Sequence, residues 1–338
     1  PRHPPPTATC TPSPTSSTTP PLAPTATPTP WQIFGIPSGY SEYLIPGSEE
    51  QMWSVYTNNQ ITNMSQQSGM HAVISVVANL DDTVVYYDHW ENGYGFNPQS
   101  ASSTADAVYY LSQGQVQIFE SSRIPVFSRG TGIYWDGMDR IYTAGGPATV
   151  TRMSWPQSVG TRYADACEVY PLKVFKNEWT MPIGENLAAA PTSYDDFTQT
   201  YVMVQSTMDG NRVEINDPWT AGTEVSVTLN KGRVTQLMIA NSGTFVAASA
   251  PVQVQMLVGD NWAPNQAWES RWYTAVPDQL WDKEYYCPVG GFRKVDTYDD
   301  TYQIATNIFV HNFYDFPISI SFQDQSGTGS FTVFSHTT

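Results

Sequence analysis

Positive charge is scarce in this sequence. Its 15 lysines and arginines face 31 aspartates and glutamates, so the chain of 338 residues carries a formal net charge of −16. Nucleic acids and anionic membrane surfaces attract clustered positive charge, and we therefore expect neither as a partner. Long apolar runs are missing as well. None approaches the roughly 18 residues of a membrane-spanning helix, so no spanning segment is predicted.

The usual signatures of catalytic and metal sites are also missing. The five histidines show no His-x-x-x-His spacing, and neither Cys-x-x-Cys nor Gly-x-Ser-x-Gly occurs. We therefore expect no catalytic residue, no cofactor and no enzyme activity. Cysteine is rare, and an odd number leaves one thiol for pairing between chains if the protein is secreted. The three cysteines are Cys10, Cys167 and Cys287.

What the sequence does contain is an internal repeat. A glutamate, an aromatic residue, a proline and a glycine recur in "SEYLIPG" (41–47), "NEWTMPIG" (177–184) and "KEYYCPVG" (283–290). An apolar run, a polar turn and a second β-branched run follow each copy. Farther on, "VYYLSQGQVQIF" (108–119) aligns with "VSVTLNKGRVTQLMI" (225–239). Because the order of these features is kept, the chain is predicted to hold two modules and part of a third.

The second copy predicts an immunoglobulin-like β-sandwich. Apolar Val225, Val227 and Leu229 alternate with polar residues, which is the period of a strand with one buried and one solvent-exposed face. The "MDGN" sequence at 208–211 is typical of a hairpin turn. About seven such strands in roughly 105 residues suit this fold. The predicted strands are Trp179–Pro182, Tyr201–Ser206, Arg212–Ile215, Glu224–Leu229, Val234–Ile239, Thr244–Ala248 and Val252–Val258. No long stretch has a helical period.

The predicted fold class is therefore all-β, with tandem immunoglobulin-like β-sandwich modules behind an extended Pro/Thr-rich segment. The first module differs from the second by two insertions, at 89–104 and 123–140, and function concentrates in such loops. The expected domains are residues 1–30 for the segment, 31–173 for module 1, 174–281 for module 2 and 282–338 for a partial module 3.

Proline, threonine and serine make up 23 of the first 30 residues. Such a segment cannot bury a core, so residues 4–30 are predicted to run extended, largely as polyproline II. Pro/Thr/Ser-rich tracts are also typical of O-glycosylated stalks. We predict O-linked sugars here and an N-linked one at the single Asn-x-Ser frame. The candidate glycosylation sites are Thr7, Thr9, Thr11, Thr15, Thr18, Thr19, Thr25, Thr27, Thr29 and Asn63.

Acidic side chains allow two interpretations. Pairs of aspartates recur about ten residues after the proline and glycine, and they could bind Ca²⁺ or cap turns of their own backbone. We favour turns. The pairs are Asp195, Asp196, Asp299 and Asp300. The same alternatives hold for four carboxylates in and beside the insertions of module 1: Asp88, Glu91, Asp136 and Asp139. Glu42, Glu178 and Glu284 share one repeat position, which favours a structural role over glycoside hydrolysis.

Several stretches resemble the N-terminal domain family of IgGFc-binding proteins and related large secreted surface proteins. They are "LNKGRVTQL" (229–237), "GTFVAASAPVQV" (243–254), "VPDQLWDKEYYCPVGG" (276–291) and "VVYYDHWENGYG" (84–95). The resemblance covers about residues 40–291. It implies a secreted or surface β-repeat protein with adhesive or structural roles, but it implies no antibody-binding residues, because the stretches are strand and turn signatures.

The partial third module carries the expectation about assembly. Its apolar side chains, Ile318, Ile320, Phe331 and Val333, have few predicted partners, and apolar strands with open edges attract another chain. We expect completion by a copy of the protein or by a continuation of a longer chain. The predicted function is a structural subunit of an extracellular, glycosylated filament, appendage or surface layer. The alternative is a cell-surface adhesin that binds carbohydrate or protein through the module 1 loops.

Overall fold

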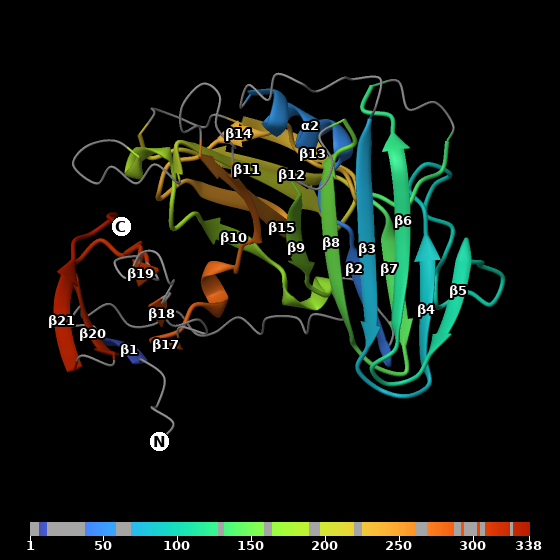
Figure 1. The fold of residues 1–338 in the computed structure, drawn as a ribbon, viewed down its shortest axis with the longest axis horizontal. Helices are drawn as coiled ribbons and strands as arrows, with labels where there is room; N and C mark the ends of the chain where they lie inside the picture. Colours follow the sequence, from blue (N-terminus) through green and yellow to red (C-terminus); the bar gives the residue numbers. More distant parts are fainter. Residues whose placement is uncertain are drawn as a thin grey trace. The chain divides into compact units, whose positions relative to one another are not determined.

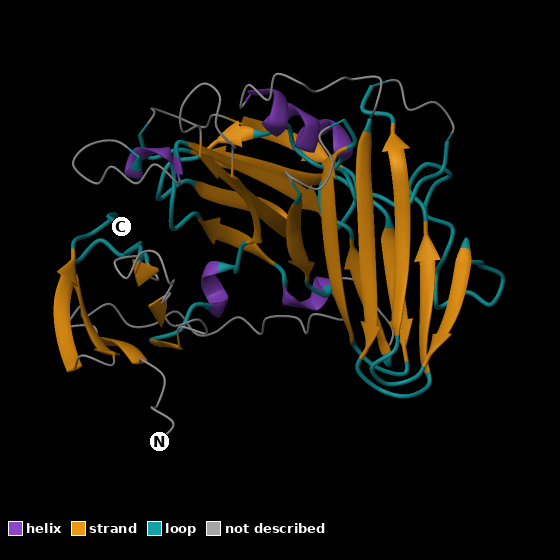
Figure 2. Ribbon diagram, in the orientation of Figure 1, coloured by secondary structure: helices purple, strands orange, loops and turns teal. Residues whose placement is uncertain are grey.

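The computed structural model describes residues 7–11, 38–58, 69–127, 132–158, 164–188, 197–219, 225–260, 269–286, 292–293, 303–304, 308–324 and 327–338. Strands dominate it (Figure 2), so the predicted all-β class is confirmed. The chain forms two compact units: Thr25–Gln279, and Pro1–Pro24 with Leu280–Thr338. In the described part of the chain, no helix is long and apolar enough to cross a membrane.

The first half of the larger unit contains two four-stranded antiparallel sheets that share one core, and we call them the first sandwich (Figure 1). Their strand orders are β2-β7-β4-β5 and β6-β3-β8-β9. Burial alternates along β3 and β8, as period-two patterning predicts. The strands are β2 (Tyr40–Leu44), β3 (Met70–Ala78), β4 (Thr83–Asp88), β5 (Ala107–Leu111), β6 (Val116–Ile124), β7 (Arg140–Ala144), β8 (Ala148–Pro156) and β9 (Asp165–Val169).

The second half forms one seven-stranded antiparallel sheet, which we call the second sheet. A single long strand, β15, holds it together. The first part of β15 pairs with β10 and β12, and the last part pairs with β11 and β16. The strands are β10 (Lys176–Thr180), β11 (Gln199–Ser206), β12 (Asn211–Asn216), β13 (Val225–Leu229), β14 (Met238–Ile239), β15 (Phe245–Asp260) and β16 (Glu269–Thr274).

Both halves use one pairing order. In the first sandwich, β7 pairs with β2 and β4, while β8 pairs with β3 and β9. In the second sheet, the two parts of β15 take the same places between β10 and β12 and between β11 and β16. The repeated sequence features therefore fall on strands with equivalent partners.

Four predicted strands differ from the observed ones. The strands predicted at 244–248 and 252–258 are one strand, because residues 249–251 lack the turn that Gly145, at φ +85°, makes between β7 and β8. The strand predicted at 234–239 shrinks to β14 and an isolated bridge of Val234. The strand predicted at 179–182 is β10, which begins and ends earlier.

A helix that was not predicted, α2 (Glu49–Asn58), packs where the two halves meet. Its Met52, Trp53 and Tyr56 belong to one buried cluster with residues of both halves, including Met70 and Leu257. The sequence does carry its signal, because Ser48 and Gln51 fit a capping box, and Ser48 Oγ accepts the Gln51 amide at 3.3 Å. The described residues also contain short 3₁₀ helices, namely η3 (Leu172–Val174), η4 (Glu185–Leu187) and η6 (Asp278–Leu280).

The smaller unit is a four-stranded antiparallel sheet of order β17-β1-β20-β21. Its inner strand β1 (Thr7–Thr11) comes from the Pro/Thr-rich segment, so the polyproline II prediction is wrong for these five residues. They contain no proline and three β-branched threonines, so every amide can enter a ladder. The other strands are β17 (Glu284–Tyr286), β18 (Phe292–Arg293), β19 (Gln303–Ile304), β20 (Ile318–Asp324) and β21 (Gly327–Val333), of which β18 pairs with β19.

One further expectation about this unit needs correction. The apolar run "NIFVHNF" (307–313), which follows the third copy of the motif, was predicted to be a strand. The described residues 308–313 form none: the Asn312 backbone amide donates to the Thr337 carbonyl, and its side-chain amide donates to the carbonyls of Phe316, Val333 and Phe334. The expectation that another chain covers the apolar residues of this unit stays a prediction. Ile318, Ile320 and Val333 are buried within this chain, whereas Phe331 is 45% exposed. The strand beside β20 is the protein's own β1.

Candidate ligand-binding site

The two loops of module 1 leave the first sandwich at one point. Strand β4 ends at Asp88 and β7 begins at Arg140, and these two residues are register partners. The loop that follows Asp88 and the loop that leads into Arg140 therefore start side by side. These loops are longer than the corresponding loops of the second sheet. Because function concentrates in such insertions, this end of the sandwich is the best candidate for a binding site.

Carboxylates hold these loops by accepting backbone amides. Asp88 accepts the amides of Gly95 and Phe96 at 3.0 and 3.2 Å. Asp106 accepts the amide of His89 at 2.7 Å. Asp139 accepts those of Trp90 and Asp136, both at 3.1 Å. For Asp88 and Asp139, the turn-forming interpretation of the loop acids therefore agrees with these hydrogen bonds.

A buried ion cluster lies beneath the loops. The Arg140 guanidinium donates to Asp88 and to the Phe96 carbonyl, and it lies 3.8 Å from Glu42. Lys231, from the turn after β13, places its Nζ 2.6 Å from the same Glu42 oxygen. Glu42 is only 1% exposed. The repeat glutamate of module 1 therefore ties the first sandwich to the second sheet through Lys231, and Lys231 and Arg140 together offset the cost of burying its charge.

His89, Glu91 and Asp139 form a group that could hold a metal ion. Their ligand atoms lie within 4.8 Å of one another. Asp139, however, already accepts the Tyr87 hydroxyl at 2.6 Å and lies 3.3 Å from His89 Nδ1, besides its two backbone donors. Those donors occupy the lone pairs that a cation would need. The geometry therefore favours a hydrogen-bonded cluster over a metal centre, and we call this cluster of His89, Asp139 and their partners the hub.

Burial shifts the protonation of this hub. Burial raises the pKa of Asp139, although hydrogen bonds from His89 and Tyr87 oppose that rise. Burial lowers the pKa of His89, but the carboxylates of Asp139, Asp106 and Glu91 raise it, and the net direction is upward. The ring also contacts Trp135, with 4.5 Å between centroids. His89 Nδ1 lies 2.8 Å from the Tyr134 carbonyl and 3.3 Å from Asp139, so this side chain links the two loops.

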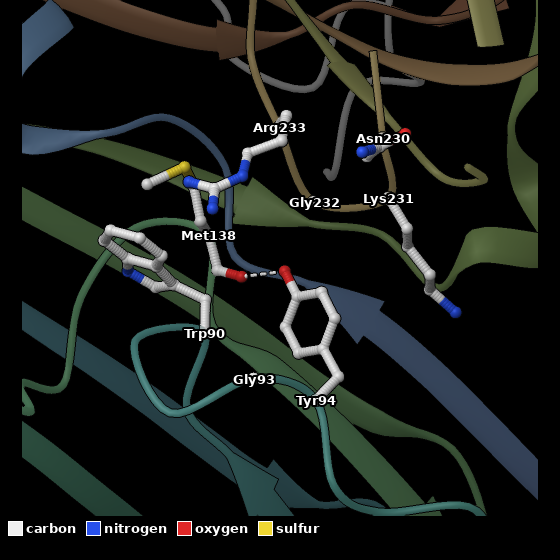
Figure 3. Close-up of a pocket in the computed structure, with 8 residues that line it drawn as sticks. All are labelled: Trp90, Gly93, Tyr94, Met138, Asn230, Lys231, Gly232 and Arg233. Carbon is white, nitrogen blue, oxygen red and sulfur yellow. Dashed lines mark hydrogen bonds between the residues drawn. The ribbon is translucent and has the colours of Figure 1, made fainter. Parts of the chain in front are cut away.

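A pocket of about 200 Å³ opens where the loop after β4 meets the turn between β13 and β14 (Figure 3). Its walls include two aromatic rings and two cationic side chains. The residues that matter are Trp90, Tyr94, Met138, Asn230, Lys231 and Arg233. The Arg233 guanidinium lies over the Trp90 ring, 4.8 Å from its centroid, and Arg140 lies 4.6 Å from the Tyr94 centroid. This pocket joins residues of both halves of the larger unit.

A second buried ion pair lies between the two halves. Arg152 of β8 donates to Glu49 of α2, and its guanidinium lies 4.9 Å from the centroid of the Trp272 ring. Two glutamine side chains of the second sheet also reach the first sandwich. Gln205 donates to the Ile45 carbonyl at 3.0 Å, and Gln253 donates to the Leu44 carbonyl at 3.3 Å. These polar contacts fix one register between the halves.

Many of the predicted site residues lie outside the described residues: Thr15, Thr18, Thr19, Thr25, Thr27, Thr29, Asn63, Asp195, Asp196, Asp299 and Asp300. Thr7, Thr9 and Thr11 lie in β1. Among the cysteines, Cys167 is buried and free, and burial raises its pKa to about 12. Its thiol is therefore unsuited to pairing between chains. The predicted assembly residues Ile318, Ile320 and Val333 share one small core cluster.

Sequence reasoning missed the residues that build the pocket. Arg233 and Lys231 lie in the stretch "LNKGRVTQL", which was interpreted only as a strand and turn signature. Trp90 and Tyr94 lie in an insertion that was predicted to carry function. No family model, curated protein or solved structure matches this chain, so the resemblance to IgGFc-binding proteins stays a prediction.

Proposed function

We propose that the protein is a structural subunit of an extracellular, glycosylated filament, appendage or surface layer, built from tandem immunoglobulin-like β-sandwich modules. The observation that carries this proposal is β1. This strand lies between β17 and β20, and its residues are register partners of residues more than 270 positions later in the chain, such as Thr9 with Ser321. A neighbouring copy could supply the same five residues without the loss of any pairing.

The connection from β1 to the rest of the chain leaves room for such an exchange. Residues 12–39 separate β1 from β2, and a connection of this length would reach roughly 90 Å in the polyproline II conformation. A strand supplied head to tail does not close on itself, so it builds a filament. The larger unit supports the stiffness of such a filament, because its two halves share a buried core and polar contacts between the halves.

Sedimentation and negative-stain microscopy of the full chain test the proposal. We expect polymers whose length grows with concentration, because each link is bimolecular. Thr9→Pro removes an amide from the middle of β1 and should shorten them. Thr18→Pro, in the same Pro/Thr-rich segment but outside β1, is the matched control and should assemble normally. A monodisperse monomer at all concentrations contradicts the proposal.

The extracellular and glycosylated parts of the proposal have their own test. Mass spectrometry of the intact secreted protein should give masses above that of the polypeptide, with hexose spacing. A mass equal to the bare polypeptide contradicts the glycoprotein assignment. Chelation in the same preparation tests the calcium alternative. We expect it to leave the melting temperature of the protein unchanged.

A second candidate function is a surface adhesin that binds carbohydrate or protein through the module 1 loops. The observation that favours it is the pocket with Trp90, Tyr94 and Arg233, because aromatic and cationic groups converge there beside the loops. Binding of the protein to glycan-coated surfaces tests it. The two functions are compatible, since a polymer of subunits would present many copies of the pocket.

A further inference from the structure

The polar side chains that line the pocket offer more hydrogen-bond donors than acceptors to a ligand. Three acceptors among the lining residues already hold a donor. The Met138 carbonyl accepts the Tyr94 hydroxyl at 2.5 Å, the Asn230 side-chain oxygen accepts the Gly210 amide at 3.3 Å, and the Gly232 carbonyl accepts Gln205 at 2.9 Å. The polar side-chain groups that the pocket walls offer to a ligand are mainly donors: the Asn230 amide nitrogen, the Lys231 ammonium and the Arg233 guanidinium. A ligand for this pocket must therefore supply acceptors.

The two cations differ in what they already bind. Lys231 is 2.6 Å from the buried Glu42, which holds it at the pocket wall. Arg233 is exposed, and among the residues that the structure describes no carboxylate lies within ion-pair distance of it. The Trp90 ring fixes its guanidinium at 4.8 Å. A positioned arginine with free donors binds a carboxylate in two-point geometry more readily than a mobile lysine does.

The position of Arg233 is notable in a chain of net charge −16. The overall charge repels anions, so the pocket cannot act through a general field. Recognition has to come from local contacts. The volume of the pocket matters too, because about 200 Å³ is below the size of pockets for larger ligands and suits one ring. The rings of Trp90 and Tyr94 offer apolar edges for the C–H groups of such a ring.

We propose that this pocket binds a carboxylated sugar unit, of the uronic acid class, within an acidic polysaccharide or glycan. Arg233 receives the carboxylate, Asn230 donates to a ring hydroxyl, and Trp90 and Tyr94 contact the ring. The proposal rests on the adhesin function and names its ligand class. It explains why the turn of the second sheet reaches over the module 1 loop, since neither half alone supplies both the aromatic rings and the free guanidinium.

Titration with free monosaccharides tests the site. Glucuronate is the probe, glucose is the neutral control, and acetate is the control for a carboxylate without a ring. Binding is followed by calorimetry and by indole fluorescence. We expect glucuronate to bind at least about tenfold more tightly than either control, a difference of about 1.4 kcal/mol. If glucose binds as tightly as glucuronate, the carboxylate is not recognised. If acetate binds as tightly as glucuronate, the ring is not recognised.

Matched arginine variants locate the binding. Arg233→Gln should weaken glucuronate binding at least about tenfold, and Arg233→Lys should recover only part of the loss. Arg212→Gln is the control, because Arg212 is an exposed arginine on β12 that pairs with Glu214 at 2.5 Å. It should bind as the unaltered protein does. Unchanged melting temperatures show that all three variants fold. Glucuronate binding that survives Arg233→Gln contradicts the proposal.

Beads coated with polyglucuronate or with neutral glucan separate the site from the function. Retention on the acidic beads that is lost in Arg233→Gln supports both. Retention that is equal for the two proteins keeps the adhesin function and rejects this pocket. Free glucuronate binding without retention on any bead keeps the pocket and rejects adhesion to acidic glycans.

Discussion

The repeated glutamate, aromatic residue and glycine serve different purposes in the copies of the motif. Glu42 is buried with Arg140 and Lys231, whereas Glu178 accepts the Gln279 amide at the surface. The aromatic position is more uniform in the first two copies. Tyr43 and Trp179 are both fully buried. In the third copy Tyr285 is 52% exposed. Sequence identity of a motif therefore predicted strand position, but it did not predict burial.

The motif glycine of the second copy gives a direct test of packing. A Cβ on Gly184 would lie 2.2–2.3 Å from backbone atoms of Asn241 and Ser242. Because backbone cannot move as a flexible side chain does, we expect Gly184→Ala to lower the free energy of unfolding by about 2 kcal/mol or more. Gly95→Ala is the control, since its nearest new contact is an ordinary 3.5 Å. Urea denaturation that shows equal stability of the two variants contradicts this packing.

Asp165 gives a test of pH dependence. Burial raises its pKa to about 6, although the hydroxyls of Ser270 and Tyr56 donate to it and oppose the rise. The folded protein therefore binds this proton more tightly than the unfolded chain. The stabilising contribution is complete below about pH 4 and is lost as the pH rises through about 6.

We expect Asp165→Asn to remove that contribution. The free energy of unfolding of the unaltered protein should fall between pH 4 and 6 more steeply than that of the variant, by up to about 1.4 kcal/mol per pH unit. Chemical denaturation at a series of pH values measures both slopes. Asp82→Asn, at an exposed position, should keep the original slope. Parallel curves for Asp165→Asn and the unaltered protein would show that Asp165 titrates normally.

At the scale of elements, period-two patterning predicted most strands of the second sheet because one face of each is buried. It could not predict that β15 runs unbroken, since the difference from β7 and β8 is a turn at Gly145 and not a change of pattern. It missed α2, whose apolar residues are few and whose helix is ten residues long. The sequence could not predict the pocket for another reason. Trp90 and Arg233 come together only after two distant segments of the chain have folded.

The helix cap is testable on its own. Ser48 accepts the Gln51 amide at the start of α2, and Ser48→Ala should cost about 1 kcal/mol of stability. Ser54, inside the same helix, donates to the Glu50 carbonyl at an exposed position. Ser54→Ala should therefore be nearly neutral. Thermal unfolding of both variants makes the comparison, and an unchanged Ser48→Ala melting temperature contradicts the cap.

At the scale of the whole molecule, the buried Arg152–Glu49 pair should determine whether the two halves of the larger unit unfold together. Glu49→Gln leaves the Arg152 charge buried without its counter-charge, so we expect a loss of about 3–5 kcal/mol. Glu50→Gln, one residue on and exposed, should cost little. Calorimetry distinguishes the two variants. Two separate transitions in the unaltered protein would contradict a shared core between the halves.

The central claim is that β1 of one copy enters the sheet of another, and a disulfide between register partners tests it most directly. Thr9→Cys and Ser321→Cys place cysteines on paired positions of β1 and β20, in a Cys10→Ser, Cys287→Ser background. Thr9→Cys with Ser330→Cys is the control, because Ser330 lies on β21, beyond β20. The account predicts a ladder of covalent multimers on a non-reducing gel for the first pair only. Disulfide-linked monomers alone would contradict it.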